Sequence, residues 1–549
     1  MEGSSGRSSI PAHEVAGESQ AVTTRAVSAN PHSAARGRSL TDPHHEAANM
    51  TIPANIEASV AAVPNFSTQQ EPKSLIVPSP GSLGTVAEAR KRLYLTIAIT
   101  YMASLSFGFS VAYSSPALPS IRRNMEFSAA ESDWFGSLVM LGAVLGGLGG
   151  GRQLNVIGRR GTLIASSLWF MVGWLCLVVA TPKAALFVGR LLTGIGTGIV
   201  ALTVSVFISE ISPANLRGQL NTGANLILCG GILAVFVLGK FLTFWLLAAC
   251  CLIPAAAMSV ALFWCHESPR WLLKNNQRRS AAAALRFYFG PGAASELATL
   301  EAALSHMHGA TGLSLRDMTS RRVYRSFLCV LLIMSMQQLS AVSIIITFTQ
   351  DIFQDAGTTV SPEDAAIILA FIQMVMVGVA TFLADRVGRK VLLVFSTILS
   401  SVCLGALGLS FSLKASVGDS FKETYGWLPL TSLGLFFVGY SVGLGPLPWV
   451  LLGEMIPLKA RAFATGICTA ILFAEAFAVT LSYNGMRAIL GVAGTFWFYG
   501  ASLVVSLVLL LVFVPETGGK DLEEIEKLFG GTSSSPQESG VKNRDQSVG

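Results

Sequence analysis

The stretch LYLTIAITYMASLSFGFSVAY, residues 93–113, contains no charged side chain, and it decides the class of fold. A helix of this length can cross about 30 Å of hydrocarbon. Further apolar runs of similar length recur as far as residue 514. A chain in lipid must satisfy its backbone amides internally, so such runs are helices or barrel strands. These runs are too long and too uniformly apolar for alternating barrel strands, which predicts an all-α integral membrane protein.

Composition supports the same class. Of the 549 residues, 52% are hydrophobic and 13% are charged, whereas soluble domains contain about 25% charged residues. Counting the apolar runs predicts about twelve membrane-spanning helices. The predicted spans are 93–113, 134–151, 162–180, 186–207, 220–239, 245–264, 326–350, 364–384, 391–411, 428–451, 463–483 and 493–514.

Lysine and arginine gather on one side of these spans. With a cytosolic N-terminus, the middle loop at 265–325 places nine of them in the cytosol. The short loops on the same side add Arg152, Arg159, Arg160, Arg217, Arg386, Arg389, Lys390, Lys459 and Arg461. This excess follows the positive-inside rule and predicts that both termini are cytosolic. Because the charges lie at membrane edges, they do not indicate a nucleic-acid partner.

No pattern indicates an enzyme, a metal site or a cofactor. Nearly all of the eight cysteines lie inside apolar spans, where small buried hydrophobes are expected. The seven histidines fall in the N-terminal segment or in 266–308, without ligand spacing. The sequence also lacks a GxxxxGK[ST] phosphate-binding loop, which argues against an ATP-driven pump.

The middle loop divides the spans six and six. We predict helical bundles at 93–264 and 326–514, with short helices in the cytosolic loop 265–325. The segment 1–88 is rich in Ser, Ala, Pro and Gly and is predicted to be a disordered cytosolic tail, and 515–549 a second cytosolic tail.

The two halves carry matching residues at corresponding places. The matched sets are Gly158-Arg159-Arg160 with Gly388-Arg389-Lys390, Glu210 and Arg217 with Glu454 and Arg461, and Glu267 with Glu516. A repeated pattern of this kind indicates duplication. Duplicated halves with a substrate site between them are a recurring architecture of secondary transporters.

Several longer motifs carry a family resemblance that covers about 93–529. They are GRLLTGIGTG (189–198), ISEISPANLRG (208–218), ESPRWLL (267–273), QQLS (337–340), DRVGRK (385–390), GPLPW (445–449) and PETGGK (515–520). The chain resembles the sugar porter family of the major facilitator superfamily, and its loop after the first span most resembles class III facilitative glucose transporters and insect trehalose transporters. The resemblance implies a major facilitator fold of two six-helix bundles and transport of a hexose-type sugar by alternating access.

Polar residues inside spans are candidates for the sugar site, because polar groups are costly at that depth. By resemblance, the substrate-binding candidates are Gln337, Gln338, Gln373, Asn225, Trp449 and Ser343. Interhelical hydrogen bonding is the alternative role for each amide. Several positions depart from the family pattern: Asn225 replaces Gln, Ser343 replaces Asn, Ala341 replaces Gly, and Leu472 and Ala476 replace Asn. These changes predict a looser or less polar pocket than a high-affinity glucose site.

Two further features bear on movement. Pro446 and Pro448 precede Trp449 and disfavour a straight tenth helix, so we predict a break that acts as a hinge, with a packing kink as the alternative. We also predict that cytosolic Arg–Glu pairs between helices hold the cytosolic side closed in the outward-open state. The residues assigned to this charge network are Arg159, Glu210, Arg217, Asp385, Arg389, Glu454, Arg461, Glu267 and Arg270.

The coupling mechanism and the host membrane remain open at this stage. Glu475, deep in the eleventh span, is a candidate proton site, whereas Ser110 stands where related proton symporters carry Asp. We therefore favour facilitated diffusion, with a proton-coupled sugar or polyol symporter and a non-transporting sugar sensor as alternatives. Glu71, Leu75 and Ile76 fit an acidic dileucine-type sorting motif, which would bind a sorting adaptor and place the protein in endosomes or lysosomes instead of the plasma membrane.

Overall fold

A computed structural model of the chain describes residues 86–180, 182–308, 321–456 and 461–516. All of them belong to one compact unit that begins at Pro78. The first helical bundle contains α1 (Val86–Ala112), α2 (Ser114–Asn124), α3 (Ala129–Val156), α4 (Gly158–Val178), α5 (Lys183–Ile211), α6 (Ala214–Phe241) and α7 (Phe244–Ala261). Of the predicted tail at 1–88, residues 1–85, which include the sorting motif, lie outside the described residues. Residues 86–88 instead form the start of α1, so the tail prediction extends three residues too far.

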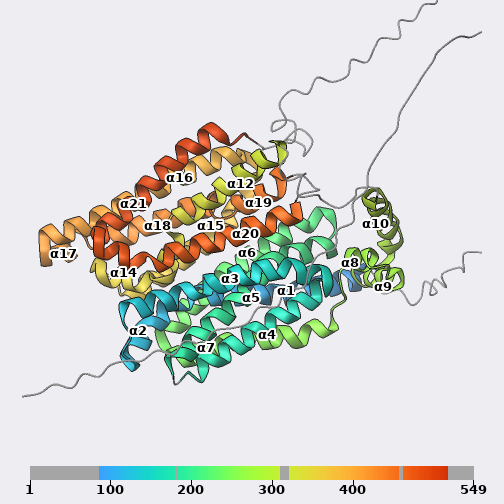
Figure 1. The fold of residues 1–549 in the computed structure, drawn as a ribbon, viewed down its shortest axis with the longest axis horizontal. Coiled ribbons are helices and arrows are strands. Elements are labelled where there is room, and N and C mark those ends of the chain that lie inside the picture. The colour runs from blue at the N-terminus through green and yellow to red at the C-terminus, as the bar shows by residue number, and fades with distance from the viewer. Residues whose placement is uncertain (1–85, 181, 309–320, 457–460, 517–549) are drawn as a thin grey trace, which may run out of the picture. The chain divides into compact units, whose positions relative to one another are not determined.

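Short helices follow the first bundle. They are η2 (Leu262–Trp264), α8 (Pro269–Lys274), α9 (Arg278–Phe289), η3 (Gly290–Gly292) and α10 (Ala293–His308). Within the described residues, α8 packs against α5, and α9 packs against α1. These short helices therefore attach to the first bundle, at the end that we call the α8 end (Figure 1).

The second bundle contains three interrupted spans. Its elements are α12 (Arg321–Leu339), α13 (Val342–Thr347), α14 (Thr349–Ala356), α15 (Pro362–Val387), α16 (Arg389–Val417), η4 (Gly418–Ser420), α17 (Phe421–Tyr425), α18 (Leu428–Val442), α19 (Leu447–Met455), α20 (Arg461–Leu481) and α21 (Tyr483–Phe513). The break between α18 and α19 confirms the prediction from the tenth span's prolines. The break between α12 and α13 and the kink at Gly491 in α21 were not predicted.

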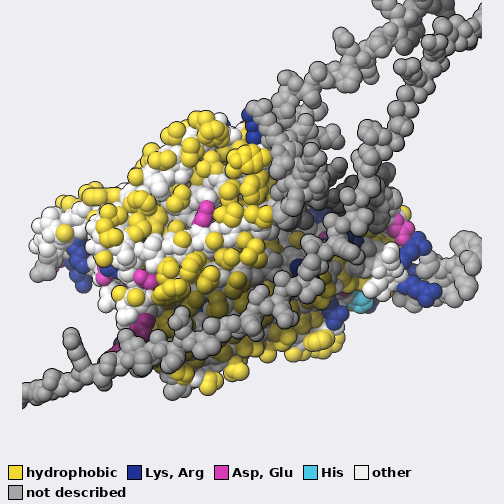
Figure 2. Space-filling model, viewed as in Figure 1, with side chains coloured by type: hydrophobic (Ala, Val, Ile, Leu, Met, Phe, Trp, Pro, Cys, Tyr) yellow, Lys and Arg dark blue, Asp and Glu magenta, His cyan; other side chains and the backbone are white. Residues whose placement is uncertain are grey.

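The number of spans is confirmed. Among the described residues, 12 helices are long and apolar enough to cross a membrane. Figure 2 shows hydrophobic side chains over much of the visible helix surface. Because such a surface suits lipid instead of water, the chain is a multi-pass membrane protein with the predicted all-α fold.

Close backbone packing holds the first bundle together. A Cβ atom added to Gly194 on α5 would lie 2.2 Å from the Val139 carbonyl oxygen on α3, and one added to Gly142 would lie 2.2 Å from the Leu191 carbonyl oxygen. Small residues allow such an approach in membranes, where no hydrophobic effect drives helices together.

The two bundles meet along α3 with α20 and α6 with α15. Figure 1 shows α1–α7 and α12–α21 as two groups of helices within the unit. Opposite the α8 end, α2 of the first bundle contacts α14 of the second, and we call this the α14 end.

Candidate functional site

A cavity of about 180 Å³ lies between the two bundles. All of the predicted substrate-binding residues line it: Asn225 on α6, Gln337 and Gln338 on α12, Ser343 on α13, Gln373 on α15, and Trp449 on α19. The structure therefore brings together residues that are spread over more than 200 positions of sequence.

The amides in this cavity differ in their protein partners. The Ser343 hydroxyl donates a 2.7 Å hydrogen bond to Oε1 of Gln338 across the break between α12 and α13, which leaves the Gln338 NH2 group for a ligand. The Gln337 Nε2 atom donates hydrogen bonds of 2.8 Å to the Leu444 and Gly445 carbonyl oxygens. Among the described residues, no hydrogen bond engages the side chains of Asn225 and Gln373, so both amides can bind a solute.

Apolar and aromatic side chains complete the wall. Leu472 and Ala476 line the cavity, where the sequence predicts lost hydrogen-bonding groups, and Trp449 adds a half-buried indole. Tyr440 and Ser441 also line the cavity and were not among the predicted substrate-binding residues. The Ser441 hydroxyl oxygen is buried and has no hydrogen-bond partner among the described residues. The sequence did offer a signal for them, because both are polar and directly precede the break predicted at Pro446.

Backbone strain marks the first break. Ala341, fully buried, has φ 60° and ψ 15°, a left-handed conformation that alanine rarely adopts. This conformation costs a non-glycine residue about 1–2 kcal/mol. The strain lies directly between Gln338 and Ser343, at the point where the seventh span turns into the cavity.

We expect Ala341→Gly to raise the unfolding temperature of the purified protein. Glycine has no Cβ and adopts positive φ without strain, which outweighs its greater freedom in the unfolded chain. The control is Ala366→Gly, within α15. There the same change should lower the free energy of unfolding by about 1 kcal/mol, and the unfolding temperature should fall accordingly. Equal lowering by both substitutions would show that the backbone at Ala341 is unstrained.

The α14 end is closed by polar contacts between the bundles. Arg122 on α2 donates two hydrogen bonds, of 2.8 and 3.1 Å, to the Asp351 carboxylate on α14. Lys240 forms a 2.5 Å ion pair with Asp364 on α15. The hydrogen bonds and ion pairs that the structure shows between the bundles, among the described residues, all lie at this end.

Further contacts seal the same end. Asn484 donates a 2.6 Å hydrogen bond to the Asp133 carboxylate on α3. The Phe348 and Tyr483 rings stack with centroids 4.9 Å apart, and both are fully buried. Phe348 also lies against Gly136 of α3, where even a Cβ atom would come within 3.2 Å of its ring. The route from the cavity to the α14 end is therefore blocked.

The predicted Arg–Glu pairs form at the α8 end, but each lies within one bundle. Arg159 and Glu210 approach to 2.7 Å, with side chains 13% and 9% exposed. Arg389 and Glu454 make the equivalent contact at 3.2 Å. The Ser268 hydroxyl also donates to Glu210, at 2.5 Å. Between described residues, no hydrogen bond or ion pair joins the two bundles at this end, so a charge network between the bundles stays a prediction for another state.

Glu267 and Glu516 make matching contacts in the two bundles. The Glu267 carboxylate accepts hydrogen bonds from the Arg159 and Arg160 amides, at 2.9 and 3.0 Å, at the start of α4. Glu516 accepts one from the Lys390 amide, at 3.1 Å, at the start of α16. Helix N-termini favour such anions.

The other members of the charge network are less defined. Arg217 is exposed and makes a long 3.4 Å hydrogen bond to the Ser212 carbonyl, while Arg270 is exposed on α8. The side chains of Asp385 and Arg461 lie outside the described residues.

Arg190 is the most deeply buried charge in the first bundle. Its guanidinium donates to the Ser110 carbonyl at 2.7 Å, to the Ser114 hydroxyl at 2.8 Å and to the Phe135 carbonyl at 3.3 Å. The hydroxyl of the adjacent Tyr113 donates a 2.8 Å hydrogen bond to the Phe244 carbonyl. The hydrogen-bond acceptors around Arg190 are therefore neutral groups.

Glu475 lies on α20 and is close in sequence to Leu472 and Ala476, but it is not among the residues that line the cavity. Its Oε1 accepts a 2.6 Å hydrogen bond from the Ser335 hydroxyl of α12. Its second oxygen is buried without a hydrogen-bond partner among the described residues. A carboxyl group that joins two helices in this way can hold a proton.

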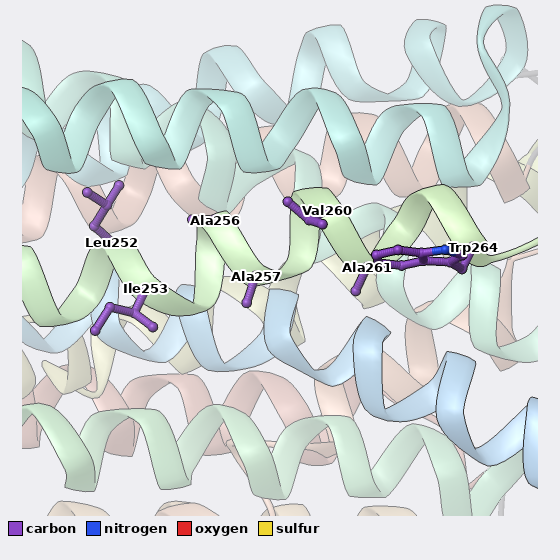
Figure 3. A pocket seen from close by; sticks show the side chains of 7 residues that line it. All are labelled: Leu252, Ile253, Ala256, Ala257, Val260, Ala261 and Trp264. Atoms are coloured by element: carbon purple, nitrogen blue, oxygen red, sulfur yellow. The ribbon is translucent and has the colours of Figure 1, made fainter.

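A second hollow is unsuited to a sugar. It runs along one face of α7 and is lined by Leu252, Ile253, Ala256, Ala257, Val260, Ala261 and Trp264 (Figure 3). Ile253 and Val260 are exposed on a membrane-spanning helix, so this face contacts lipid.

Comparisons with known proteins agree with this architecture. A family described as "Sugar (and other) transporter" matches residues 96–529. The facilitated trehalose transporter Tret1 of Apis mellifera ligustica is 34% identical over 443 residues, covering 78% of this chain and 86% of that protein. The solute carrier family 2, facilitated glucose transporter member 8, of Bos taurus is 33% identical over 485 residues, covering 84% and 99%.

Solved structures share the fold. The xylose transporter XylE from E. coli in its inward-open conformation superimposes with a TM-score of 0.67 at 23% identity, covering 79% of this chain and 99% of that one. XylE bound to 6-bromo-6-deoxy-D-glucose gives a TM-score of 0.66 at 22% identity, covering 80% and 99%. With the family match extending over most of its length, this chain belongs to the sugar transporter family of the major facilitator superfamily.

Proposed function

We propose that the protein carries a hexose-type sugar across a membrane by facilitated diffusion, using alternating access and no ATP. The observation that carries this proposal is the cavity between the bundles, where residues from both halves present free amides and an indole. Transport requires a site that both halves form, because rocking the halves then changes the side from which the site is reached.

The cavity chemistry fits a sugar. The amides of Asn225 and Gln373 can replace hydroxyl–water hydrogen bonds, and the half-buried indole of Trp449 suits the apolar face of a sugar ring. Leu472 and Ala476 offer no hydrogen bonds, which favours modest affinity. The family consists of transporters, so no enzymatic reaction is proposed.

The closed α14 end supports an inward-facing state. We assign the α8 end to the cytosol, because the basic middle loop lies there and the positive-inside rule favours it. The α14 end is then outside, and the contacts of Arg122, Lys240 and Asp133 close it. Both termini are cytosolic in this orientation.

The test is counterflow in proteoliposomes that contain the purified chain. Vesicles loaded with unlabelled sugar should accumulate the same labelled sugar transiently, within a panel of glucose, fructose, galactose, trehalose and inositol. Gln373→Leu should raise the half-saturation constant. A chain that exchanges no sugar in the panel, while binding one of them, would be a sensor instead of a carrier.

We expect Glu454→Gln to lower the maximal transport rate by about tenfold while surface expression changes little. The substitution removes one carboxylate that pairs with the half-buried Arg389, and such pairs are costly to break from one side. Rates are compared with the control Glu423→Gln, an exposed residue on α17 at the other end of the bundle. An unchanged maximal rate would exclude a role for this pair in the transport cycle.

A proton-coupled sugar symporter is the second candidate, favoured by the Glu475–Ser335 hydrogen bond. The neutral surroundings of Arg190, where Ser110 provides only a carbonyl, weigh against it. If coupling occurs, sugar entry acidifies the vesicle interior, and Glu475→Gln abolishes the acidification. Sugar entry without acidification leaves facilitated diffusion.

A separate experiment identifies the membrane in which the protein acts. We propose that Glu71, Leu75 and Ile76 bind a sorting adaptor and keep part of the protein in endosomes or lysosomes. Leu75→Ala together with Ile76→Ala should then move the protein to the plasma membrane, as measured by surface labelling. If the distribution does not change, the plasma membrane is the site of action.

A further inference from the structure

A carboxyl group is buried between the bundles at the α14 end. Asp133, in the second turn of α3, is 6% exposed. Among the described residues, its hydrogen-bond donors both belong to Asn484 of α21 and carry no charge. An ionised carboxylate is costly to bury without an opposite charge, whereas a protonated carboxylic acid is much less so. The charges around Asp133 therefore decide which form the closed end accommodates.

The nearest cations are already paired. Arg122 of α2 and Arg487 of α21 both lie within electrostatic reach of Asp133. Arg122 donates two hydrogen bonds to the Asp351 carboxylate. Arg487 approaches the Asp355 carboxylate to 2.5 Å. Each pair has no net charge, so the two pairs offset little of a negative charge on Asp133. Burial then makes the neutral acid the more stable form while this end is closed.

The other ionisable groups on the helices around Asp133 are engaged or neutral. Lys183 of α5 forms a 2.8 Å ion pair with Glu131 of α3. Glu475 of α20 is bound by a serine hydroxyl of α12. Tyr483 of α21 carries a phenol, whose oxygen is buried without a hydrogen-bond partner among the described residues. All seven histidines belong to the N-terminal segment or the middle loop. A response of the α14 end to pH near neutrality would therefore point to Asp133.

We propose that Asp133 is a proton-binding site of the α14 end, protonated while the bundles are closed there and ionised when they part and water reaches it. This inference rests on the proposed alternating access. A ligand favours the state that binds it more tightly, and the ligand here is the proton. Acidity therefore favours the closed α14 end, and a rise in pH favours its opening.

This site differs from a coupling site in the path of its proton. Asp133 gains and loses its proton on the α14 side, because it lies within the contact that closes that end. The proton returns to the side from which it came, so no net proton movement accompanies the sugar. The site therefore regulates access to the cavity and does not drive transport.

The experiment measures the distance across the α14 end with spin labels in lipid nanodiscs, without sugar. The labels are attached to Arg123→Cys on α2 and Lys422→Cys on α17, since both side chains are exposed. Each single-cysteine variant gives the background from native thiols. Between about pH 5.5 and pH 8.5, the population with the longer distance should grow about threefold or more.

Neutral substitutions at Asp133 identify the group that responds. In the labelled protein, Asp133→Asn mimics the protonated acid and should keep the short distance at every pH. Asp133→Ser should behave in the same way, and it serves if the asparagine variant does not fold. The matched control is Glu131→Gln, on the same helix, whose ion pair with Lys183 lies within one bundle. It should retain the parent's response.

Three results would overturn the proposal. They are an absent pH response in the parent, a response that persists in Asp133→Asn, and growth of the longer distance as the pH falls. The last result would assign the response to the ion pairs, because acid weakens a pair by neutralising its carboxylate. The distances require neither sugar nor a known orientation in the membrane. Normal counterflow with no pH response would therefore reject this proposal alone, and a pH response without counterflow would reject only the proposed function.

Discussion

Gly194→Val should leave almost no folded protein that can be extracted from the membrane. The Gly194 Cα lies against the backbone of α3, where an added Cβ would come within 2.2 Å of the Val139 carbonyl oxygen. A backbone oxygen cannot move away as a side-chain rotamer can, so α3 and α5 must separate. Separation loses the packing that joins these helices in lipid, and the cost exceeds the 1–3 kcal/mol typical of an overpacked core.

The measurement is size-exclusion chromatography of detergent-extracted protein, with the unfolding temperature of any monodisperse fraction. Gly149→Val is the matched control on α3, because nothing lies within 4 Å of a Cβ built there. That variant should elute and unfold like the parent. Normal elution of Gly194→Val at the parent's unfolding temperature would contradict the close approach of α3 and α5.

Arg122→Glu should open the α14 end, which faces outside in the proposed orientation, and speed access to the cavity from there. The substitution replaces two hydrogen bonds to Asp351 with a repulsion between two carboxylates. Arg122 is 35% exposed and Asp351 12%, so solvent screens the pair and its loss is worth about 1 kcal/mol. With the added repulsion, we expect an impermeant thiol reagent to label Val111→Cys, a cavity position, about fivefold to tenfold faster in intact cells.

Two further variants test whether the loss of the Arg122–Asp351 contact causes the faster labelling. Arg123→Glu changes the same charge on the same helix, but Arg123 donates only to the Pro119 carbonyl of its own helix, so labelling should stay at the parent rate. Arg122→Glu combined with Asp351→Arg reverses the pair and should restore slow labelling. Equal acceleration by Arg123→Glu would attribute the effect to surface charge instead of contact between the bundles.

The helices and the cavity follow from local and repeated patterns. Apolar length decided the spans, and Pro446 and Pro448 predicted the tenth-helix break because proline removes a donor. The break at Ala341 could not be predicted in this way. Its flanking residues include no proline or glycine, and only the packed bundle imposes the left-handed backbone there.

The charge contacts also include some that the sequence predicts and one that it does not. The Arg159–Glu210 and Arg389–Glu454 pairs could be predicted because the duplication repeats an Arg after the second span and a Glu after the fourth span of each half, although the members of the pair are 51 residues apart in one half and 65 in the other. The Arg122–Asp351 pair occurs once and joins positions 229 residues apart. Neither periodicity nor a motif connects such residues, so only the fold reveals the closed α14 end.

Glu267 and Glu516 have a mechanical consequence. Each ties the last residues of a half to the start of that half's third membrane helix. A ring of covalent chain closed by hydrogen bonds resists elastic deformation, so each half tilts as a rigid body. Binding energy gained in the cavity then favours rotation of one half against the other, with little spent on bending the helices at the α8 end.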